Sequence, residues 1–507
     1  MNDQQILVSA AEAQESRSTI PLPPFRRPLL SFHLVLGAML VLLIALFAQP
    51  TVADPDIWWH LNFAEQIVTT HSWPQVDTYS FTAAGSKWMD HEWAAELAYL
   101  AAFRAFGIRG LYALYFLLAC TIEILILYRS YKLTGDIKNS FLVAGFCVLL
   151  IVVSFGPRML LFGWLYMLLM LIALDRFREG SMKVLCGIPP LFMLWINTHG
   201  SWLIGLVVFG IIIVAGLVRI DWGHVESELW TRNQVRALGV AFAASVALLF
   251  VNPYGYRLVT YPFDMAFHQT LNISHVEEWA SVDFHTARGK VVFILLASVL
   301  SAALFSKRRW KVHEVLVVAL ALYSGLTYVR FLFMIAVLVS PVIAARVRFF
   351  PPYEAAKDKQ WLNAVFLIVV AGIVLWRFPN DGKLQQSVDE KYPTKAIEYL
   401  RRNGIKDRVL NDYLWGGYID RFYPAMPVFI DSRVDIFEYN GTLKDYLDLT
   451  SLKNSHAILD RHDIRYVLFN KNQPLVYHLR QLPEWRVLYE DEVAALVKRE
   501  ARQSESQ

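Results

Sequence analysis

ADPDIWWHL, residues 53–61, places two carboxylates, a tandem tryptophan and a histidine directly after the apolar run 31–50. A helix needs about 20 apolar residues to cross the hydrocarbon core of a bilayer. The run is therefore long enough to span a membrane, and charge follows where the span ends. This arrangement predicts a membrane protein with a working site at the membrane edge.

The composition of the whole chain indicates repeated membrane spans. Of its 507 residues, 56% are hydrophobic and only 18% are charged. The mean hydropathy of +0.37 is too apolar for an ordinary soluble protein. The net charge of +4 is small for this length, and Lys and Arg cluster between apolar runs instead of forming a basic face. We expect the lipid bilayer to be a partner, and nucleic acid not to be one.

Apolar segments of membrane length recur along the chain. By the length criterion there are about eleven, at 31–50, 110–128, 139–156, 158–175, 183–198, 200–218, 235–252, 290–306, 311–327, 329–346 and 361–377. A further segment, 92–107, carries Glu92, Glu96 and Arg104 and is short for a span. Its placement decides the topology.

Basic loops indicate where 92–107 lies. If this segment does not cross, the Lys- and Arg-rich loops all fall on one side, which the positive-inside rule assigns to the cytoplasm. If it crosses, YRSYKLTGDIK (128–138) and SKRRWK (306–311) move outside, against that rule. We therefore predict an amphipathic helix on the outer surface. The predicted fold class is a mainly α polytopic membrane protein with a cytoplasmic tail 1–30, a transmembrane domain 31–377 with external loops 51–109 and 253–289, and an external domain 378–507.

The predicted external domain has the composition of a soluble protein. Helix-like KAIEYLRRNG alternates with short strand-like runs such as RVLN and IRYVLFN, which predicts a small α/β domain. Two motifs, LNDYLWGGY and FIDSRVD, place four polar residues near apparent strand ends: Asp412, Asp431, Arg433 and Asp435. Such residues often line a binding crevice. The sequence of this domain contains no nucleophile with a base partner, phosphate loop or metal motif, so we interpret it as a recognition domain.

The two carboxylates of ADPDIWWHL have different interpretations. Asp54 precedes Pro55, and this pair is a good helix start because aspartate caps free amides and proline suits the first helical position. We therefore interpret Asp54 as a cap. Asp56 and His60 are spaced i, i+4 and share a helix face, so they can bind a metal or pass a proton. The alternative for Asp56 is a dipole partner in the first turn.

WMDHEW (88–93) supplies a second polar cluster in the same external loop. Asp90, His91 and Glu92 stand between two tryptophans at the mouth of the predicted surface helix. They are either the second half of a site with Asp56 or caps and dipole partners of that helix.

Two turns add further candidates. NTHG (197–200) joins two apolar runs and carries His199, for which a plain turn between spans is the alternative. FVNPYGYR (250–257) has the composition of a turn, yet it leads through Tyr256 into a long external loop that holds Glu278. Long loops without strong structure signals are often functional.

Two arginines lie on the side where the positive-inside rule depletes them. Arg158 in SFGPRML and Arg330 in TYVRFLF fall at or just inside the predicted outer ends of spans. A cation at such a depth usually pairs with an anion inside the protein, and arginine suits a phosphate because its donors are planar and bidentate. The alternative is that both side chains reach out to lipid headgroups.

Taken together, these features resemble the GT-C superfamily of membrane glycosyltransferases, and most of all the protein O-mannosyltransferase type with its bacterial relatives, including lipid A aminoarabinose transferases. DPDIWWHL stands where those enzymes have an acidic pair, WMDHEW lies near their second acidic position, and FGIRGLYAL is similar to the run into their second span. A proline splits the acidic pair in this chain.

The resemblance implies transfer of a sugar from a polyprenyl-phosphate donor to a glycan, lipid or protein acceptor, outside a bacterial inner membrane and with inversion. Asp56 is our candidate general base. Catalytic candidates are Asp56 and Glu92, and substrate-binding candidates are His60, Asp90, His91, Arg158, His199, Tyr256, Glu278 and Arg330. Asp56, His60 and Glu92 are also a candidate site for Mg²⁺, Mn²⁺ or Zn²⁺, which would stabilise the phosphate leaving group.

Two alternatives come from other functional classes. In a transporter or flippase of a lipid-linked or anionic substrate, the buried arginines and acidic loops would form a substrate path. Against this, the ionisable residues crowd one face instead of the bilayer midplane, and no inverted repeat is visible in the sequence. In a non-catalytic membrane assembly factor, the C-terminal domain would bind a partner.

Overall fold

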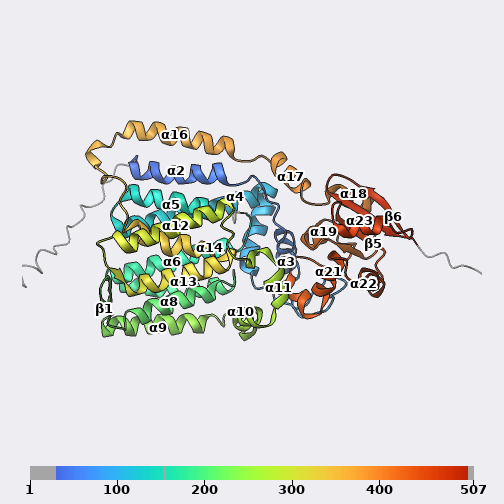
Figure 1. The fold of residues 1–507 in the computed structure, drawn as a ribbon, viewed down its shortest axis with the longest axis horizontal. Helices are drawn as coiled ribbons and strands as arrows, with labels where there is room; N and C mark the ends of the chain where they lie inside the picture. Colours follow the sequence, from blue (N-terminus) through green and yellow to red (C-terminus); the bar gives the residue numbers. More distant parts are fainter. Residues whose placement is uncertain (1–29, 152–155, 501–507) are drawn as a thin grey trace, which may run out of the picture.

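The computed structural model describes residues 30–151 and 156–500, and its helices form a bundle with the C-terminal domain at one end (Figure 1). The predicted tail 1–30 lies almost wholly outside the described residues, as does the end of the predicted span 139–156. The bundle axes run side by side, so one end of the bundle faces the C-terminal domain.

Each predicted span contains helix. The bundle consists of α2 (Phe32–Phe47), the second part of α4 (Trp93–Thr134), α5 (Ile137–Ile151), α6 (Leu160–Arg178), η2 (Met182–Gly187) with α7 (Ile188–Ile196), α8 (Trp202–Ala215), α9 (Arg232–Leu248), α12 (Ala287–Phe305), α13 (Val312–Thr327) and α16 (Gln360–Arg377). Among the described residues, α4, α6, α12 and α16 are long and apolar enough to cross a membrane, and six further apolar helices are shorter. The count of eleven crossings and their orientation stay predictions.

The last predicted span before α16 is broken into short pieces. It consists of η4 (Val329–Phe331), α14 (Leu332–Met334), the π-helical η5 (Ile335–Val339) and α15 (Ser340–Ala344). The 3₁₀ turn η4 carries Arg330, and Arg330 lines the cavities described below. A change of helix type is common at functional sites.

A sharp kink at Gly107 divides α4 into two parts. Gly107 has φ 59° and ψ −146°, a conformation that glycine adopts readily because it has no Cβ. At Gly110 a Cβ would lie 1.9 Å from the carbonyl oxygen of Ala102, so the two parts meet too closely for any larger residue. The part before the kink lies across the end of the bundle (Figure 1), which agrees with the expected separation of 92–107 from the next span.

The two long predicted external loops contain more helix than the sequence suggested. The first carries α3 (Ile57–Thr70), and the second carries α10 (Tyr256–His268), α11 (Thr270–His275) and η3 (Glu277–Trp279). Loop 253–289, interpreted above as lacking strong structure signals, is therefore mostly helical. At the opposite end of the bundle, β1 (Asp221–Trp222), β2 (Val225–Glu226) and β3 (Trp310–Lys311) form a small sheet in the order β1-β2-β3.

The C-terminal region is α/β, as its sequence pattern indicates. Its sheet has the order β4-β5-β7-β6, in which β4 (Val409–Asn411) pairs parallel with β5 (Tyr466–Asn470), and β7 (Ala494–Arg499) pairs antiparallel with β5 and with β6 (Trp485–Glu490). The helices are α17 (Asp381–Asp389), α18 (Thr394–Arg402), η7 (Tyr413–Trp415), α19 (Gly416–Phe422), α20 (Val434–Tyr439), α21 (Thr442–Thr450), α22 (Ser455–Arg461) and α23 (Pro474–Arg480). The apolar run VFID (428–431) forms only isolated bridges, through Val428.

The C-terminal domain and the first predicted external loop, 51–109, share a hydrophobic core. Trp59, Phe63 and Trp88 of the loop pack in one cluster with Phe429 and Phe437 of the domain, and all five are buried. Because burying a large apolar side chain contributes about 1.5–3 kcal/mol, this interface fixes the domain against α3. The domain therefore forms a wall of the site beneath it.

Candidate active site

The predicted polar residues meet in two neighbouring cavities between the bundle, the first external loop and the C-terminal domain. The smaller has a volume of about 180 Å³ and the larger about 600 Å³. Residues that line both include His91, Glu92, Arg158, His199, Glu278 and Arg330, while Asp54, Asp56 and His60 line the smaller one only. Eight of the ten predicted site residues are thus brought together.

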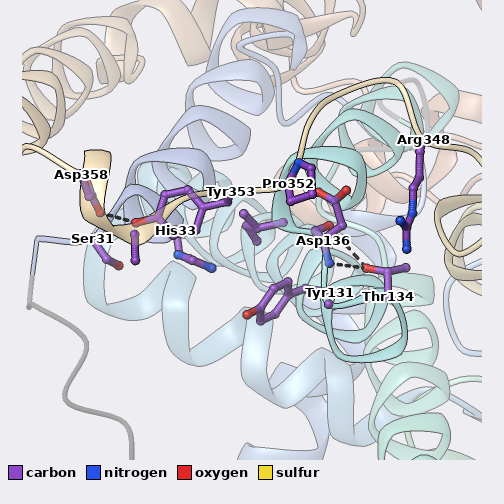
Figure 2. A pocket seen from close by; sticks show the side chains of 12 residues that line it. Ser31, His33, Tyr131, Thr134, Asp136, Arg348, Pro352, Tyr353 and Asp358 are labelled. Atoms are coloured by element: carbon purple, nitrogen blue, oxygen red, sulfur yellow. Dashed lines mark hydrogen bonds between the residues drawn. The ribbon is translucent and has the colours of Figure 1, made fainter. Parts of the chain in front are cut away.

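A third cavity, of about 360 Å³, lies at the opposite end of the bundle, and its carboxylates are engaged in local structure (Figure 2). Asp136 accepts hydrogen bonds from the backbone N–H groups of Lys138 (3.0 Å) and Asn139 (3.2 Å) at the start of α5. Asp358 accepts bonds from Phe32 N (3.0 Å) and the Tyr353 hydroxyl (2.6 Å). These contacts assign the carboxylates to helix starts and loop packing.

Asp56 is half-buried and is the residue before α3 begins. Its side chain makes no cap hydrogen bond to the helix amides, so the dipole-partner interpretation does not account for its contacts. Instead, the Trp59 indole N–H donates to Asp56 Oδ1 at 3.3 Å. Burial raises the pKa of Asp56 to about 7, and the nearby Asp54 carboxylate contributes to the rise. A carboxylate that titrates near neutrality is suited to general base chemistry.

The interpretation of Asp54 as only a helix cap is incomplete, because its side chain also forms an ion pair. Its Oδ1 accepts a hydrogen bond from Asp56 N at 3.1 Å, a turn contact. Its Oδ2, however, accepts a 2.6 Å bond from Nε of Arg158. Asp54 is buried, so it is a fixed anion inside the site.

Arg158 has the internal anionic partners that its position predicted, but both are protein carboxylates. Nε binds Asp54, and Nη1 binds Glu278 of η3. Two negative groups thus share one guanidinium, which leaves Arg158 with little positive charge to offer a ligand. Its main contribution is to hold Asp54 and Glu278 in place.

Arg330 is the more available cation. Its guanidinium carbon lies 4.3 Å from the centroid of the Trp279 ring, a cation–π distance. Among the described side chains, none of the ion pairs involves Arg330. Arg330 also lines both cavities, so its charge is directed at the enclosed space.

Three histidines surround Glu92, the residue before α4. Nε2 atoms of His60, His199 and His91 lie 3.5, 3.6 and 3.8 Å from its carboxylate oxygens. On its other side, His60 Nδ1 is hydrogen-bonded to Glu96 at 2.6 Å. The sequence spacing of Asp56 and His60 suggested a direct pair, but His60 turns toward Glu92 and Glu96.

Burial favours the uncharged forms of the residues in this cluster. It lowers the pKa of His91 to about 4 and of His199 to about 3, and it also lowers the pKa of His60. The pKa of Glu92 is raised well above its usual range by burial and then by Asp56 and Asp90. At neutral pH the histidines are therefore uncharged, and the shift of Glu92 favours its protonated form.

The candidate cation site does not fit the residues as they stand. Within residues 30–151 and 156–500, no group of three His, Cys, Asp or Glu side chains has a metal-holding arrangement. Ser201 N donates to Nδ1 of His199 at 3.1 Å, so the ring hydrogen of His199 is on Nε2, the nitrogen that faces Glu92. The cation stays a prediction, and no step below uses it.

Two predicted site residues do not line the cavities. Tyr256 is 68% exposed, so its assignment to the site is wrong; the buried tyrosines of this region are Tyr254 and Tyr261. Asp90 is buried behind the site and accepts a hydrogen bond from Glu92 N at 3.2 Å. Asp90 therefore supports Glu92 and does not face the enclosed space.

The FIDSRVD motif reaches the site from the C-terminal domain. Ser432, Arg433, Val434 and Asp435 line the smaller cavity. The Tyr261 hydroxyl donates to Asp435 at 2.9 Å, which ties α10 to the domain. Sequence reasoning placed this motif at a binding crevice, but nothing in it indicated which element it would face.

Sequence reasoning also missed Arg288, which lines the larger cavity beside Glu278 and Arg330. One signal for it was present. Arg288 lies in TARGK, at the predicted outer end of the span 290–306, where arginine is depleted by the positive-inside rule. Arg158 and Arg330 were predicted as site residues for the same reason, namely an arginine on the side where the rule depletes it.

Solved structures share the fold of this chain, and two of them are compared with it. The chain matches the crystal structure of the Archaeoglobus fulgidus oligosaccharyltransferase in the apo form, with a TM-score of 0.54 and 11% identity over 87% of this chain and 69% of that chain. It also matches ArnT from Cupriavidus metallidurans bound to undecaprenyl phosphate, with a TM-score of 0.51 and 13% identity over 91% of this chain and 96% of that one. Both are members of the GT-C superfamily, so this chain has a GT-C fold. No protein-family model and no curated protein matches the sequence.

Proposed function

We propose that this protein is a membrane glycosyltransferase that moves a sugar from a polyprenyl-phosphate donor to an acceptor on the extracytoplasmic face. One observation carries the proposal: Asp56, with a pKa of about 7, and the available cation Arg330 line the same cavity. A base and a phosphate-binding cation are the two groups that this transfer needs. The GT-C fold, and a neighbour bound to undecaprenyl phosphate, support the same function.

In the proposed reaction Asp56 takes the proton of the acceptor hydroxyl. The acceptor oxygen then forms a bond to the anomeric carbon of the sugar while the bond from that carbon to the donor phosphate oxygen breaks. The phosphate leaves with the electron pair, and Asp56 keeps the proton. Attack on the side opposite the leaving group inverts the anomeric centre.

Arg330 stabilises the leaving phosphate in this scheme. Negative charge grows on the phosphate in the transition state, and a fixed cation in a poorly hydrated site stabilises it strongly. Arg158 is less suited because Asp54 and Glu278 already bind its guanidinium. We therefore assign phosphate binding to Arg330 and a positioning role to Arg158.

The larger cavity suits the lipid part of the donor. Its apolar lining comes from the bundle and includes Trp164, Leu203, Ile204 and Phe333. An isoprenoid chain in this space removes apolar surface from water, which contributes about 25 cal/mol per Å². The phosphate would then lie where the two cavities share their lining, beside Arg330.

The proposed function also predicts in which membrane the protein lies and on which side its C-terminal domain is found. The protein would reside in a bacterial inner membrane with the C-terminal domain outside, because the polar site and that domain lie at one end of the bundle (Figure 1). A topology reporter fused after residue 380 tests this placement. A cytoplasmic signal would contradict it.

Replacement of the base tests the function. Asp56→Asn preserves shape and removes the carboxylate, so we expect loss of sugar transfer by at least about 100-fold. The matched control is Asp463→Asn in the C-terminal domain, because Asp463 is exposed and its φ of 49° is a conformation that asparagine also adopts. Transfer is measured with purified protein, labelled undecaprenyl-phosphate sugars and envelope acceptors. Unchanged transfer in Asp56→Asn would refute the mechanism, and movement of the lipid across liposomes without a covalent product would favour the transporter alternative.

A further inference from the structure

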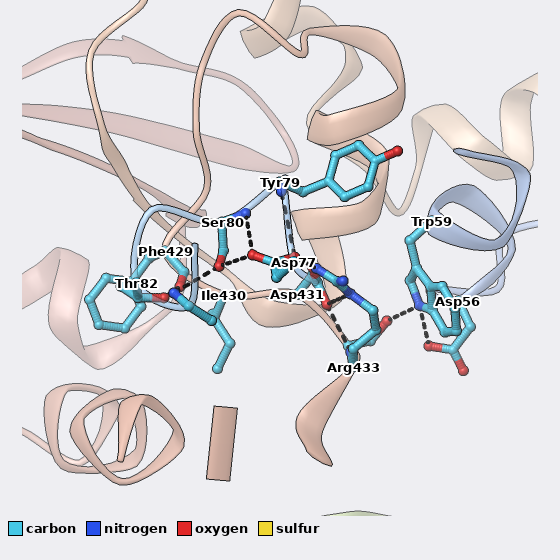
Figure 3. A network of polar contacts seen from close by, with 12 residues as sticks. Asp56, Trp59, Asp77, Tyr79, Ser80, Thr82, Phe429, Ile430, Asp431 and Arg433 are labelled. Atoms are coloured by element: carbon cyan, nitrogen blue, oxygen red, sulfur yellow. Dashed lines mark hydrogen bonds and ion pairs between the residues drawn. The ribbon is translucent and has the colours of Figure 1, made fainter. Parts of the chain in front are cut away.

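A single indole N–H joins the proposed base to the C-terminal domain. Nε1 of Trp59 lies 3.3 Å from Asp56 Oδ1 and 3.0 Å from the hydroxyl oxygen of Ser432 (Figure 3). Since the indole donates to Ser432, the hydroxyl hydrogen of Ser432 is available to another acceptor. Because both groups accept from the same indole N–H, the Ser432 hydroxyl lies beside the Asp56 carboxylate, with which it interacts.

The loop that carries Ser432 is held firmly by its neighbour Arg433. Nε of Arg433 binds both carboxylate oxygens of Asp431, at 2.9 and 3.1 Å, and Nη2 binds Asp77 of the first external loop at 2.6 Å. The side chains of Arg433 and its two partners are no more than 1% exposed. A buried pair of this kind is a poor source of net stability but fixes geometry.

Close backbone packing brings the same loop against Trp59. A Cβ on Gly416 would lie 2.4 Å from the carbonyl oxygen of Ile430, and one on Gly417 would lie 3.1 Å from the backbone N of Trp59. The two glycines of LWGGY therefore let α19 approach both partners. This accounts for a motif that the proposed reaction does not use.

We propose that Ser432 of the C-terminal domain is a positioning residue for Asp56, so that the docked segment 431–435 completes the active site. The inference rests on the proposed function. It goes beyond it because the domain, interpreted above as a recognition module, would then set the state of the base itself. Ser432 acts through Asp56 and touches no reacting atom in this scheme.

The charges around Asp56 make the effect of Ser432 measurable. Burial raises the pKa of Asp56 most, and the charges of Asp54 and Glu278 raise it further, whereas Ser432 and Arg158 lower it. Glu92 and the Tyr392 hydroxyl also interact with Asp56. Removing the hydroxyl of Ser432 takes away an interaction that favours the ionised carboxylate, so the ionised fraction of Asp56 should fall at neutral pH.

Carbodiimide labelling of Asp56 tests the inference in the intact, solubilised protein. Carbodiimides react with the protonated carboxyl group, so labelling with an amine, located by peptide mass spectrometry, gives the pH midpoint of Asp56 without any need for transfer. In Ser432→Ala we expect this midpoint to rise by about one pH unit, since a polar interaction that favours the ionised carboxylate is lost. Ser432→Thr retains the hydroxyl and should restore the wild-type midpoint.

Thr82→Val is the matched control. Thr82 donates its hydroxyl to the carbonyl of Phe429 in the same interface, on the side of Arg433 away from Asp56 (Figure 3). The Thr82→Val variant loses one interdomain hydrogen bond and should leave the pH midpoint of Asp56 labelling unchanged. An equal shift in Thr82→Val and Ser432→Ala would overturn the inference, because general loosening of the interface would then explain both.

The two proposals fail separately. If Asp56→Asn abolishes transfer while Ser432→Ala leaves the Asp56 midpoint and the pH profile of kcat/KM unchanged, the glycosyltransferase mechanism stands and the role of Ser432 is refuted. If Ser432→Ala shifts the midpoint but Asp56→Asn transfers normally, Ser432 positions Asp56 but Asp56 is not the base. Should Ser432→Ala not fold, the comparison is made between Ser432→Cys and Ser432→Thr, and equal midpoints in wild type, Cys and Thr variants would again refute the inference.

Discussion

Asp54 and Arg158 form an ion pair that joins the first external loop to the start of α6, with Nε of Arg158 2.6 Å from Asp54 Oδ2. The two side chains are 9% and 28% exposed, and Glu278 binds the other side of the guanidinium. The fixed negative charge of Asp54 lies beside Asp56 and helps to raise its pKa. The two aspartates of the opening motif are therefore electrostatically linked.

Replacement of Asp54 should destabilise the fold and also affect the base. In Asp54→Ala, Arg158 loses one partner but keeps Glu278, so we expect a loss of about 2 kcal/mol, less than the about 3–5 kcal/mol typical of a fully buried pair. Thermal unfolding in detergent measures this loss. Arg104→Ala, which breaks an exposed pair with Glu65, is the control and should change stability by less than about 1 kcal/mol. Equal melting temperatures for Asp54→Ala and wild type would contradict the structural role.

The pKa of Asp56 predicts the pH dependence of transfer. Burial raises this pKa from 3.8 to about 7, and the base acts only when ionised. Transfer should therefore increase with pH through about 7 and fall by about tenfold per pH unit below it. The measurement is kcat/KM across pH 3.5 to 9. An acid limb near pH 4 would show that Asp56 has an ordinary pKa or is not the base.

Arg330 should decide the binding of the donor phosphate. A charge-assisted hydrogen bond contributes about 1.5–3 kcal/mol, so Arg330→Ala is expected to weaken binding of undecaprenyl phosphate by about 10- to 100-fold. Arg330→Lys should recover only part of the affinity, because lysine lacks the planar, bidentate donors and stacks less well on Trp279. Binding is measured by titration in detergent. Arg257→Ala serves as control, since Arg257 lines neither cavity, and equal losses in the two alanine variants would argue against a specific role of Arg330.

The buried ion pairs of Arg433 with Asp77 and Asp431, which we call the clamp, should determine whether the C-terminal domain stays docked. Arg433→Ala leaves the carboxylates of Asp77 and Asp431 buried without their partner, which is expected to cost about 3–5 kcal/mol. Arg433→Lys should rescue little of this loss because it cannot bind both carboxylates in the same geometry. Limited proteolysis between α16 and α17 reports release of the domain. The control is Arg465→Ala, which breaks an exposed pair with Asp463 and should be cleaved like the wild type. If Arg433→Ala resists cleavage as well as the wild type does, the clamp is contradicted.

Much of the fold is encoded in local features that a single sequence displays. Apolar runs placed the helices, and the charges of 92–107 separated that segment from the following span. Gly107 provides the break between them, since its φ of 59° suits glycine. The C-terminal sheet followed from alternating strand and helix signals. Each of these features depends on neighbours close in the chain.

The site was less predictable because its key contacts join residues distant in the chain. Nothing near Asp54 in the sequence indicates that Arg158 is its partner. Helix capping therefore explained an aspartate at this position but did not predict its ion pair. Composition likewise identified the turn around Tyr256 without showing which tyrosines face inward. Ser432 illustrates the limit: an ordinary serine gains importance only because Arg433 and two glycines bring it to Trp59.

The two predicted catalytic carboxylates, Asp56 and Glu92, should respond differently to amide substitution. Burial, Asp56 and Asp90 raise the pKa of Glu92 well above its usual range, which favours the protonated form, so Glu92→Gln retains the charge and shape of that form. We expect transfer to fall by less than about tenfold in this variant, against at least about 100-fold in Asp56→Asn, where an ionised base is lost. Single-turnover transfer at pH 7.5 measures both. Glu92→Ala is the control for packing and should be worse than Glu92→Gln, because it leaves His60, His91 and His199 without their shared neighbour. If Glu92→Gln instead loses as much activity as Asp56→Asn, then Glu92 acts in its ionised form, and the neutral cluster derived from its burial is incorrect.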